Sequence, residues 1–220
     1  MDTDDQPFTL PRRGILFIIS APSGAGKTTL SRQLLKLVPN LRPSISYTTR
    51  VPRAGEVNGK DYHFVEEDYF LRLRAAGAFA EWAQVHGYLY GTARAPLDEA
   101  LEQGRDLLLD IDVQGARQIK SSYTEATLIF ILPPSWQELE RRLHARATDN
   151  AEVIRKRLQR AWEEAGELFS YDYWLVNDQV KGTVGVLQSI ILAERARVSR
   201  LMRKHVSAIL FSAPQGEKPV

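Results

Sequence analysis

The stretch ILFIISAPSGAGKTT, from Ile15 to Thr29, decides the fold of this chain. Its first five residues, Ile15–Ile19, are all apolar, as expected for a strand. Small residues and glycines follow, and then Leu30 and Leu34 recur at helical spacing. A strand, a tight loop and a helix in this order predict a phosphate-binding turn in an α/β domain.

The loop itself matches the phosphate-loop pattern with one departure, because Ala21 stands where the pattern has its first glycine. In such a loop, backbone N–H groups point into a concavity at a helix N-terminus, where partial positive charge gathers. Lys27 can reach the β- and γ-phosphates of a nucleotide, and the Thr28 hydroxyl can bind Mg²⁺. The alternative is a glycine-rich turn with an exposed lysine. The residues that we expect to bind the triphosphate are Ala21, Pro22, Ser23, Gly24, Ala25, Gly26, Lys27, Thr28 and Thr29.

Composition excludes several classes of protein. The 220 residues are 44% hydrophobic and 25% charged, as in ordinary globular domains, and the net charge of +2 demands neither nucleic acid nor a membrane surface. The sequence has no cysteine, which excludes disulfides, thiolate zinc sites and cysteine nucleophiles. No signal peptide or membrane span is apparent, so we expect a cytoplasmic protein with a disordered N-terminal arm (1–13) and a flexible tail (209–220).

The block 44–93 interrupts the α/β alternation and predicts a small mixed-β insertion. In it we expect strands at 45–48, 62–65, 79–82 and 84–90 and a helix at 67–76. The alternation then resumes with helices at 95–103 and 114–121, strands at 106–111, 126–132 and 173–176, two basic helices after Ser135 and Asn150, and a long last helix at 181–205. Such alternation predicts a parallel sheet flanked by helices.

Ligands bind at the carboxyl ends of the strands in a sheet of this kind. The phosphate loop, Asp110, Asp112 and Asn177 all follow strands and should gather at that edge. Asp110 ends an apolar strand, where a phosphate-loop protein places an acidic group near Mg²⁺. The alternative is a turn residue without a ligand.

Arginines and one glutamate complete the candidate residues. Phosphoryl transfer needs alignment and charge stabilisation, which guanidinium forks supply. The candidates are Arg50, Arg53, Arg142, Arg146 and Arg157, although a solvated helix face explains the last three equally well. Glu81 lies on a strand and could accept two N–H bonds from guanine, although an ordinary edge-strand glutamate is the simpler interpretation.

Six segments in their order and spacing carry a resemblance: SAPSGAGKTTL, SISYTTRVPRAGEVNGKDYHFV, FAEWAQVHGYLYGT, LLLDIDVQGA, IFILPPS and LVND. Together they resemble the guanylate kinase family, over about residues 14–205. The pattern TTR-x-PR-x-GE-x-x-G-x-x-Y is characteristic of this family's nucleotide-binding insertion.

The resemblance implies the reaction of ATP with GMP to give ADP and GDP, with Mg²⁺. It also implies a single phosphate-loop NTPase-type domain at 14–208, with a core (14–43, 94–136 and 162–208), a GMP-binding insertion (44–93) and a helical lid (137–161). Both parts would close over the nucleotides.

Residue by residue, the resemblance implies three sets. Lys27, Arg50, Arg142, Arg146 and Arg157 would be catalytic, Thr28 and Asp110 (through water) would serve the metal, and Asn177 would lie near adenine. GMP would be bound by Ser46, Arg50, Arg53, Tyr62, Glu81, Tyr90, Thr92 and Asp112. The family often has Ser at the position of Thr92 and usually has Gly at that of Ala147, in the lid hinge.

Two rival classes remain open. A guanylate-kinase-like module that binds proteins without catalysis usually has a degraded phosphate loop, whereas Gly26, Lys27 and Thr28 are intact here. A related kinase of ribose phosphates would lack Glu81 and the TTR-x-PR loop. The expected partners are ATP and GMP, with dGMP as a compatible acceptor, no nucleic acid and no membrane; a homo-oligomer is compatible with the sequence.

Overall fold

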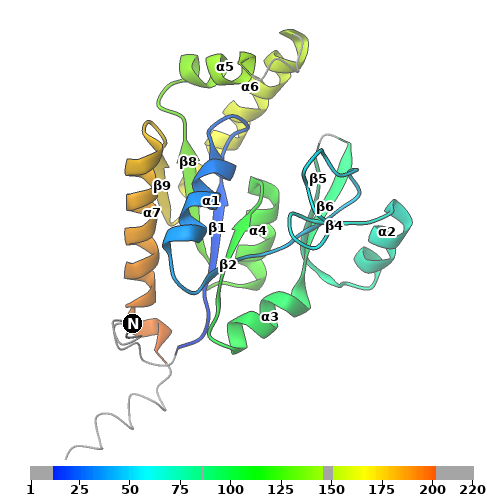
Figure 1. Cartoon of the computed structure of the whole chain (residues 1–220), viewed down its shortest axis with the longest axis vertical. Coiled ribbons are helices and arrows are strands. Elements are labelled where there is room, and N and C mark those ends of the chain that lie inside the picture. Colours follow the sequence, from blue (N-terminus) through cyan, green and yellow to red (C-terminus); the bar gives the residue numbers. More distant parts are fainter. Residues whose placement is uncertain (1–11, 86, 146–150, 202–220) are drawn as a thin grey trace, which may run out of the picture.

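The computed structural model describes residues 12–85, 87–145 and 151–201 of the chain. It contains a five-stranded sheet and a four-stranded sheet that lie side by side, with helices around them (Figure 1). The expected phosphate-loop α/β fold with a mixed-β insertion is therefore confirmed. In the part of the chain that is described, every helix is too short or too polar to cross a membrane.

The larger sheet is entirely parallel. Its strand order is β2 (Leu41–Pro43), β7 (Asp106–Asp110), β1 (Leu16–Ser20), β8 (Thr127–Leu132) and β9 (Tyr173–Val176). The three longest expected core strands fall within one residue of their predicted bounds, but β2 was not predicted, because three residues ending in Pro43 carry no strand pattern. All the carboxyl ends lie at one edge, which places the loop after β1 there.

Both faces of this sheet are covered, as the apolar strands predict. In β1, Phe17 and Ile19 face one cluster of side chains, and Leu16 and Ile18 face the other. The first face is covered by α1 (Lys27–Leu37) and α7 (Val180–Arg195), and the second by α3 (Arg94–Glu102) and α4 (Val113–Ser122). The phosphate loop is therefore held between a buried strand and a buried helix.

The smaller sheet is mixed, in the order β4 (His63–Phe64), β3 (Tyr47–Thr48), β6 (Tyr88–Ala93) and β5 (Phe79–Val85). Phe70 of α2 (Glu67–Ala75) packs against it. The predicted break between strands at residue 83 is wrong, because β5 continues to Val85 and pairs with β6 as a hairpin. Gly87 supplies the positive φ of 85° that the turn needs.

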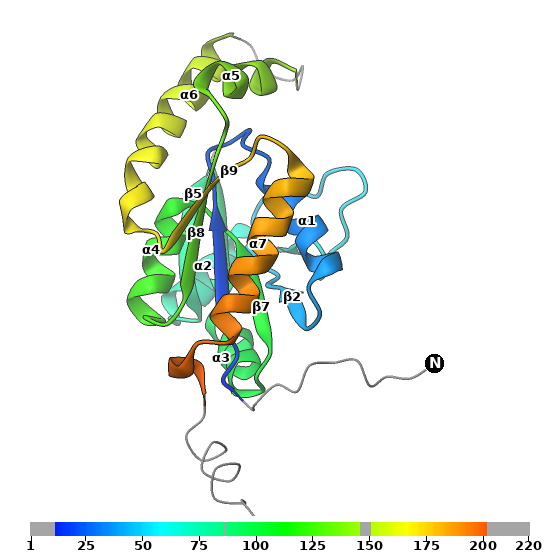
Figure 2. The ribbon, with the colours of Figure 1, turned by 90° about the vertical axis from the view of Figure 1, so that its left-hand side faces the viewer.

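Two helices stand above the carboxyl edge of the larger sheet (Figure 2). Ser135 caps α5 (Trp136–His144) by accepting a hydrogen bond from the Glu138 N–H. The longer α6 (Ala151–Gly166) then runs back down toward a 3₁₀ turn (Glu167–Ser170) and the start of β9. Leu139 and Leu143 of α5 pack against Ile154 and Ala161 of α6, so the two helices share a small core of their own.

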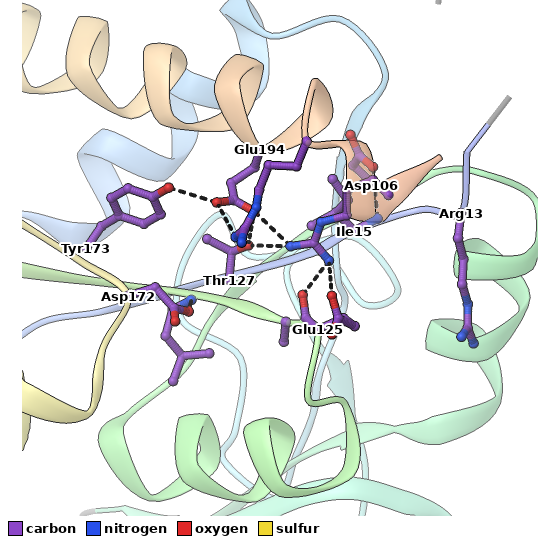
Figure 3. Close-up of polar contacts among 12 residues, drawn as sticks. Arg13, Ile15, Asp106, Glu125, Thr127, Asp172, Tyr173 and Glu194 are labelled. Atoms are coloured by element: carbon purple, nitrogen blue, oxygen red, sulfur yellow. Dashed lines mark hydrogen bonds and ion pairs between the residues drawn. The ribbon is translucent and has the colours of Figure 1, made fainter. Parts of the chain in front are cut away.

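The last helix ends ten residues earlier than expected, at Arg195 rather than His205; residues 202–205 lie outside the described part. A 3₁₀ turn (Val198–Arg200) follows instead, and Val198 is exposed. The turn brings Arg200 back to the buried carboxylate of Glu194, at 2.8 Å, and Tyr173 donates to the same carboxylate (Figure 3). An ion pair with Glu194 thus outweighs the helical pattern.

Arg12 also departs from the expected disordered arm. Its guanidinium pairs through both terminal nitrogens with the fully buried Asp106, at 2.7 Å each. Residues 1–11 and the expected tail at 209–220 lie outside the described residues.

Candidate active site

The phosphate loop depends on two glycines with left-handed backbone, Gly24 and Gly26, each at φ 97°. A Cβ on Gly26 would lie 2.4 Å from Asn177 Nδ2, and that amide donates to the Ala25 carbonyl at 2.7 Å. Asn177 therefore supports the loop from the end of β9. Its expected contact with adenine stays a prediction.

The loop opens into a cavity of about 270 Å³ between the larger sheet and α6. Seven residues of the expected triphosphate site line it together with Lys27, and the wall opposite is formed by Val85 and by side chains of α6. The lining residues are Ala21, Pro22, Ser23, Gly24, Gly26, Lys27, Thr28, Thr29, Val85, Asp112, Arg157, Arg160 and Glu164. Ala25, by contrast, is buried beneath the loop.

The Lys27 side chain extends from the start of α1 to the carboxyl end of the neighbouring strand β7. Its ammonium pairs with Asp110 Oδ1 at 2.7 Å and donates to the Ile111 carbonyl at 2.9 Å. Ser31 also donates to Asp110, at 3.4 Å. The structure thus brings together the cation and the carboxylate that the sequence placed at this edge.

Asp112 directly precedes α4, and its Oδ1 caps that helix by accepting from the Gly115 N–H at 2.9 Å. Arg160 and Glu164 of α6 lie next to it in the cavity, and neither was predicted. A weak signal existed, because Arg160 follows Arg157 by three residues and so shares its helix face.

A second group of side chains lies on the smaller sheet. Glu81 is 3% exposed and accepts a hydrogen bond of 2.5 Å from the Thr92 hydroxyl, which in turn is 2.9 Å from the Ser46 hydroxyl. The pKa of Glu81 is raised to about 7, chiefly by burial; the Thr92 hydrogen bond opposes the shift and the nearby Asp112 contributes to it. Three of the residues expected at the guanine base and phosphate are therefore in one network.

Arg50 is held beside this network by Glu56, which the sequence had not singled out. Its Nη2 lies 2.9 Å from both Glu56 oxygens, and its guanidinium lies over the rings of Tyr62 and Phe64. The Glu56 hydrogen bond raises the pKa of Arg50 and lowers that of Glu56. The guanidinium is therefore fixed in place and fully charged.

Two tyrosines and Arg53 lie near Arg50 and Glu56. Tyr62 and Tyr90 have their rings 5.9 Å apart, and burial raises the pKa of the Tyr62 phenol to about 12, so this phenol is a neutral donor. Arg53 contributes its backbone N–H, which donates to Glu56 at 2.8 Å, while its side chain is exposed.

The three expected lid arginines have different positions. Arg142 donates to Glu138 at 2.7 Å and to the Asn177 carbonyl at 3.3 Å, which ties α5 to the end of β9. Arg157 lines the phosphate-loop cavity. Arg146 lies outside the described residues.

Fold and site together define a phosphate-loop α/β protein of the nucleotide-kinase class, with a cavity at the phosphate loop and a second group of polar side chains on the smaller sheet. Residues 13–194 match the sequence model of the guanylate kinase family. The chain therefore belongs to the guanylate kinase family, which confirms the resemblance expected from the sequence.

Individual relatives agree with this assignment. The chain is 58% identical to the guanylate kinase of Syntrophotalea carbinolica over 192 residues, which are 87% of this chain and 91% of that protein. It is 52% identical to the guanylate kinase of Geobacter metallireducens over 88% of this chain and 95% of that protein. The crystal structure of guanylate kinase from Anaplasma phagocytophilum superposes with a TM-score of 0.76 at 33% identity, over 91% of this chain and 97% of that one.

Proposed function

We propose that this protein transfers the γ-phosphoryl group of ATP to GMP, giving ADP and GDP. The observation that carries the proposal is the pairing of two sites in one molecule. The molecule has an intact phosphate loop with Lys27 at its cavity, and it also has a buried Glu81–Thr92–Ser46 network and an Arg50 that Glu56 holds in place. Membership of the guanylate kinase family supports the same reaction.

On the donor side, the ATP triphosphate would bind along residues 21–29. Backbone N–H groups at the start of α1 and the Lys27 ammonium would offset its charge. Lys27 already points at the carboxyl edge of the sheet through its contacts with Asp110 and the Ile111 carbonyl. When ATP enters, the ammonium can exchange these contacts for phosphate oxygens without moving far.

The residues present fit a magnesium ion that arrives with ATP. Among the described residues no three His, Asp or Glu side chains converge as a metal cage. Mg²⁺ is usually held by one or two protein oxygens, substrate phosphates and water, so a cage is not needed. The Thr28 hydroxyl and, through water, Asp110 would hold it, and the ion would neutralise charge on the transferring phosphate.

On the acceptor side, ionised Glu81 would accept the N1–H and N2–H of guanine, with Thr92 and Asp112 at the same base. Adenine has no N2 amino group and an unprotonated N1, so it would leave Glu81 unpaired, and sites of this kind discriminate strongly. Arg50, Arg53, Ser46, Tyr62 and Tyr90 would bind the GMP phosphate. The Arg50 fork suits a phosphate because its planar donors can bind two oxygens at once.

Transfer itself would then depend on alignment and charge. We assign to Arg142, Arg146 and Arg157 the stabilisation of the negative charge that develops on the transferring phosphoryl group. Residues 137–161 would form the lid, and residues 44–93 would form the GMP-binding insertion. Closure of the lid would exclude water, which otherwise accepts the phosphoryl group. Asn177 would lie near adenine, and dGMP would serve as a second acceptor. The enzyme would act in the cytoplasm, in nucleotide metabolism.

A coupled assay with ATP and Mg²⁺ against GMP, AMP, CMP and UMP tests the proposal. We expect turnover with GMP and rates at least about 100-fold lower with the other three. Faster turnover with AMP would overturn the base assignment. Absence of turnover with all four, in a protein whose circular dichroism shows it folded, would favour the protein-binding module.

A further inference from the structure

Asp112 has two carboxylate oxygens in different situations. Oδ1 accepts the hydrogen bond that caps α4, at 2.9 Å from the Gly115 nitrogen. Oδ2 is buried from solvent, and no residue in the described ranges donates a hydrogen bond to it. A buried carboxylate oxygen without a donor is costly, so its surroundings need explanation.

The nearest cation to this oxygen comes from α6. Arg160 Nη2 lies 3.5 Å from Asp112 Oδ2, and Arg160 Nε donates to Glu164 Oε1 at 3.1 Å. Glu164 is one helical turn further along, so it fixes the direction of the guanidinium across the cavity. Arg160 therefore reaches from the helix above the sheet to the residue that caps α4.

This corner of the cavity contains an excess of carboxylates. The pKa of Glu81 and that of Glu164 are both raised, chiefly by burial, and Asp112 contributes to each shift. The ammonium of Lys27 is already engaged by Asp110. Arg160 thus supplies positive charge where Glu81, Asp112 and Glu164 would otherwise repel one another.

We propose that Arg160 is a positioning residue for the acceptor nucleotide, which holds Asp112 Oδ2 toward the guanine base and links α6 to the wall of the acceptor site. This inference rests on the proposed function, because it gives Asp112 a role in binding GMP. A carboxylate oxygen has two lone pairs, so Oδ2 can accept from Arg160 and from the base together. Without Arg160, the Asp112 carboxylate would turn away from Glu81 and Glu164.

The shape of the arginine side chain is part of the proposal. Arg160 Nε donates to Glu164, and Nη2 of the same guanidinium lies 3.5 Å from Asp112 Oδ2, so two separate nitrogens of a planar group face the two carboxylates. A lysine would bring the charge but only a single ammonium, and could satisfy one of the two carboxylates well. Arg160→Lys should therefore recover only part of the effect of Arg160.

The test compares Arg160→Met, Arg160→Lys and a matched control, Lys156→Gln, one turn earlier on α6. Lys156 is 75% exposed and pairs only with its helix neighbour Glu152 among the contacts described. Calorimetric titration with GMP in the absence of ATP gives the acceptor Kd. Steady-state kinetics then separate kcat from the KM values for GMP and ATP.

We expect Arg160→Met to raise Kd and KM for GMP by roughly 5- to 10-fold, with kcat and the KM for ATP within about twofold of the wild type. Arg160→Lys should give an intermediate value and Lys156→Gln the wild-type value. Unchanged or tighter GMP binding in Arg160→Met overturns the inference. So does a fall in kcat alone, which would make Arg160 a phosphate-contacting residue. If the wild type itself neither binds nor phosphorylates GMP, it is the proposed function that fails.

Discussion

The carboxyl group of Glu81 shows how burial sets the chemistry of a single residue. It is 3% exposed, and one wall of its pocket is α4, where a Cβ on Gly115 would lie 2.6 Å from Glu81 Oε2. Burial raises its pKa to about 7, against 4.5 for a free glutamate, with Asp112 adding to the shift. Glu81 is therefore divided between its acid and its carboxylate near neutral pH.

The pH dependence of catalysis should report this group. In the proposed complex the carboxylate accepts both guanine N–H groups, whereas the neutral acid cannot, so kcat/KM for GMP should rise with pH and level off above about 7. Glu81→Gln should lower kcat/KM by about 100-fold or more and remove this part of the rise. Initial rates from pH 5.5 to 8.5, with the KM for ATP measured as control, test the prediction. A wild-type profile that is flat through pH 7 would contradict it.

The same shift makes a prediction for stability. Because the folded pKa lies above the unfolded one, the folded state keeps its proton longer as pH rises from about 4.5 to 7, and stability falls over that window. Glu81→Gln removes this decline. We expect its Tm to match the wild type near pH 5 and to exceed it by roughly 5 °C at pH 8, by scanning calorimetry. An equal Tm difference at both pH values would show that ionisation of Glu81 is not the cause.

Among the helices and strands, those specified by their own residues could be predicted from the sequence, whereas features set by long-range packing could not. The strand, loop and helix of residues 16–37 were predictable, because each is specified by its own residues. The end of α7 was not, since the apolar pattern continues to Val198 and Leu201 while ion pairs to Glu194 turn the chain. Arg160 was missed for a similar reason. Its place beside Asp112 follows from the packing of α5 on α6, which no short segment encodes.

The turn between β1 and α1 requires a residue without a Cβ at position 26. Alanine there would adopt an unfavourable φ of 97° and place its Cβ 2.4 Å from the buried Asn177 amide, which the Ala25 carbonyl holds. Gly26→Ala should lower the free energy of unfolding by roughly 2 to 3 kcal/mol and weaken ADP binding at least about 10-fold.

Gly182→Ala is the matched control for that change. Gly182 lies in α7, and a Cβ there meets no atom within 4 Å, so alanine should stabilise by roughly 0.5 to 1 kcal/mol through helix propensity. Urea unfolding of both variants and fluorescence titration with ADP provide the measurements. Wild-type nucleotide affinity in Gly26→Ala would show that the loop tolerates a side chain at this position.

Across the whole molecule, the two ends of the larger sheet have separate tasks. Strand β7 has Asp110 at its carboxyl end, paired with Lys27, and Asp106 at its amino end, paired with Arg12 and Arg195. Four residues of extended chain place these carboxylates roughly 13 Å apart. The amino end also receives Glu194 with Arg197 and Arg200, so both ends of the described chain are bound at the base of the sheet, away from the proposed nucleotide sites (Figure 3).

This separation predicts that stability and catalysis can be altered independently at Asp106. Its side chain is fully buried, accepts from both terminal nitrogens of Arg12 and from Arg195 Nε at 2.7 Å, and accepts from the Ile15 N–H at 2.9 Å.

Asp106→Asn leaves two partly buried guanidinium groups without their counter-charge, so we expect the free energy of unfolding to fall by about 3 kcal/mol and Tm to fall by roughly 10 °C. At 25 °C, kcat and the KM for GMP should stay within about twofold of the wild type, because the proposed nucleotide sites lie toward the other end of β7. Glu125→Gln is the control, since that carboxylate is 77% exposed and 3.5 Å from Arg200, and its loss should change Tm by about 1 °C or less. Equal effects of the two variants on Tm, or a fall in kcat that matches the loss of stability in Asp106→Asn, would show that the base of the sheet and the nucleotide sites are coupled.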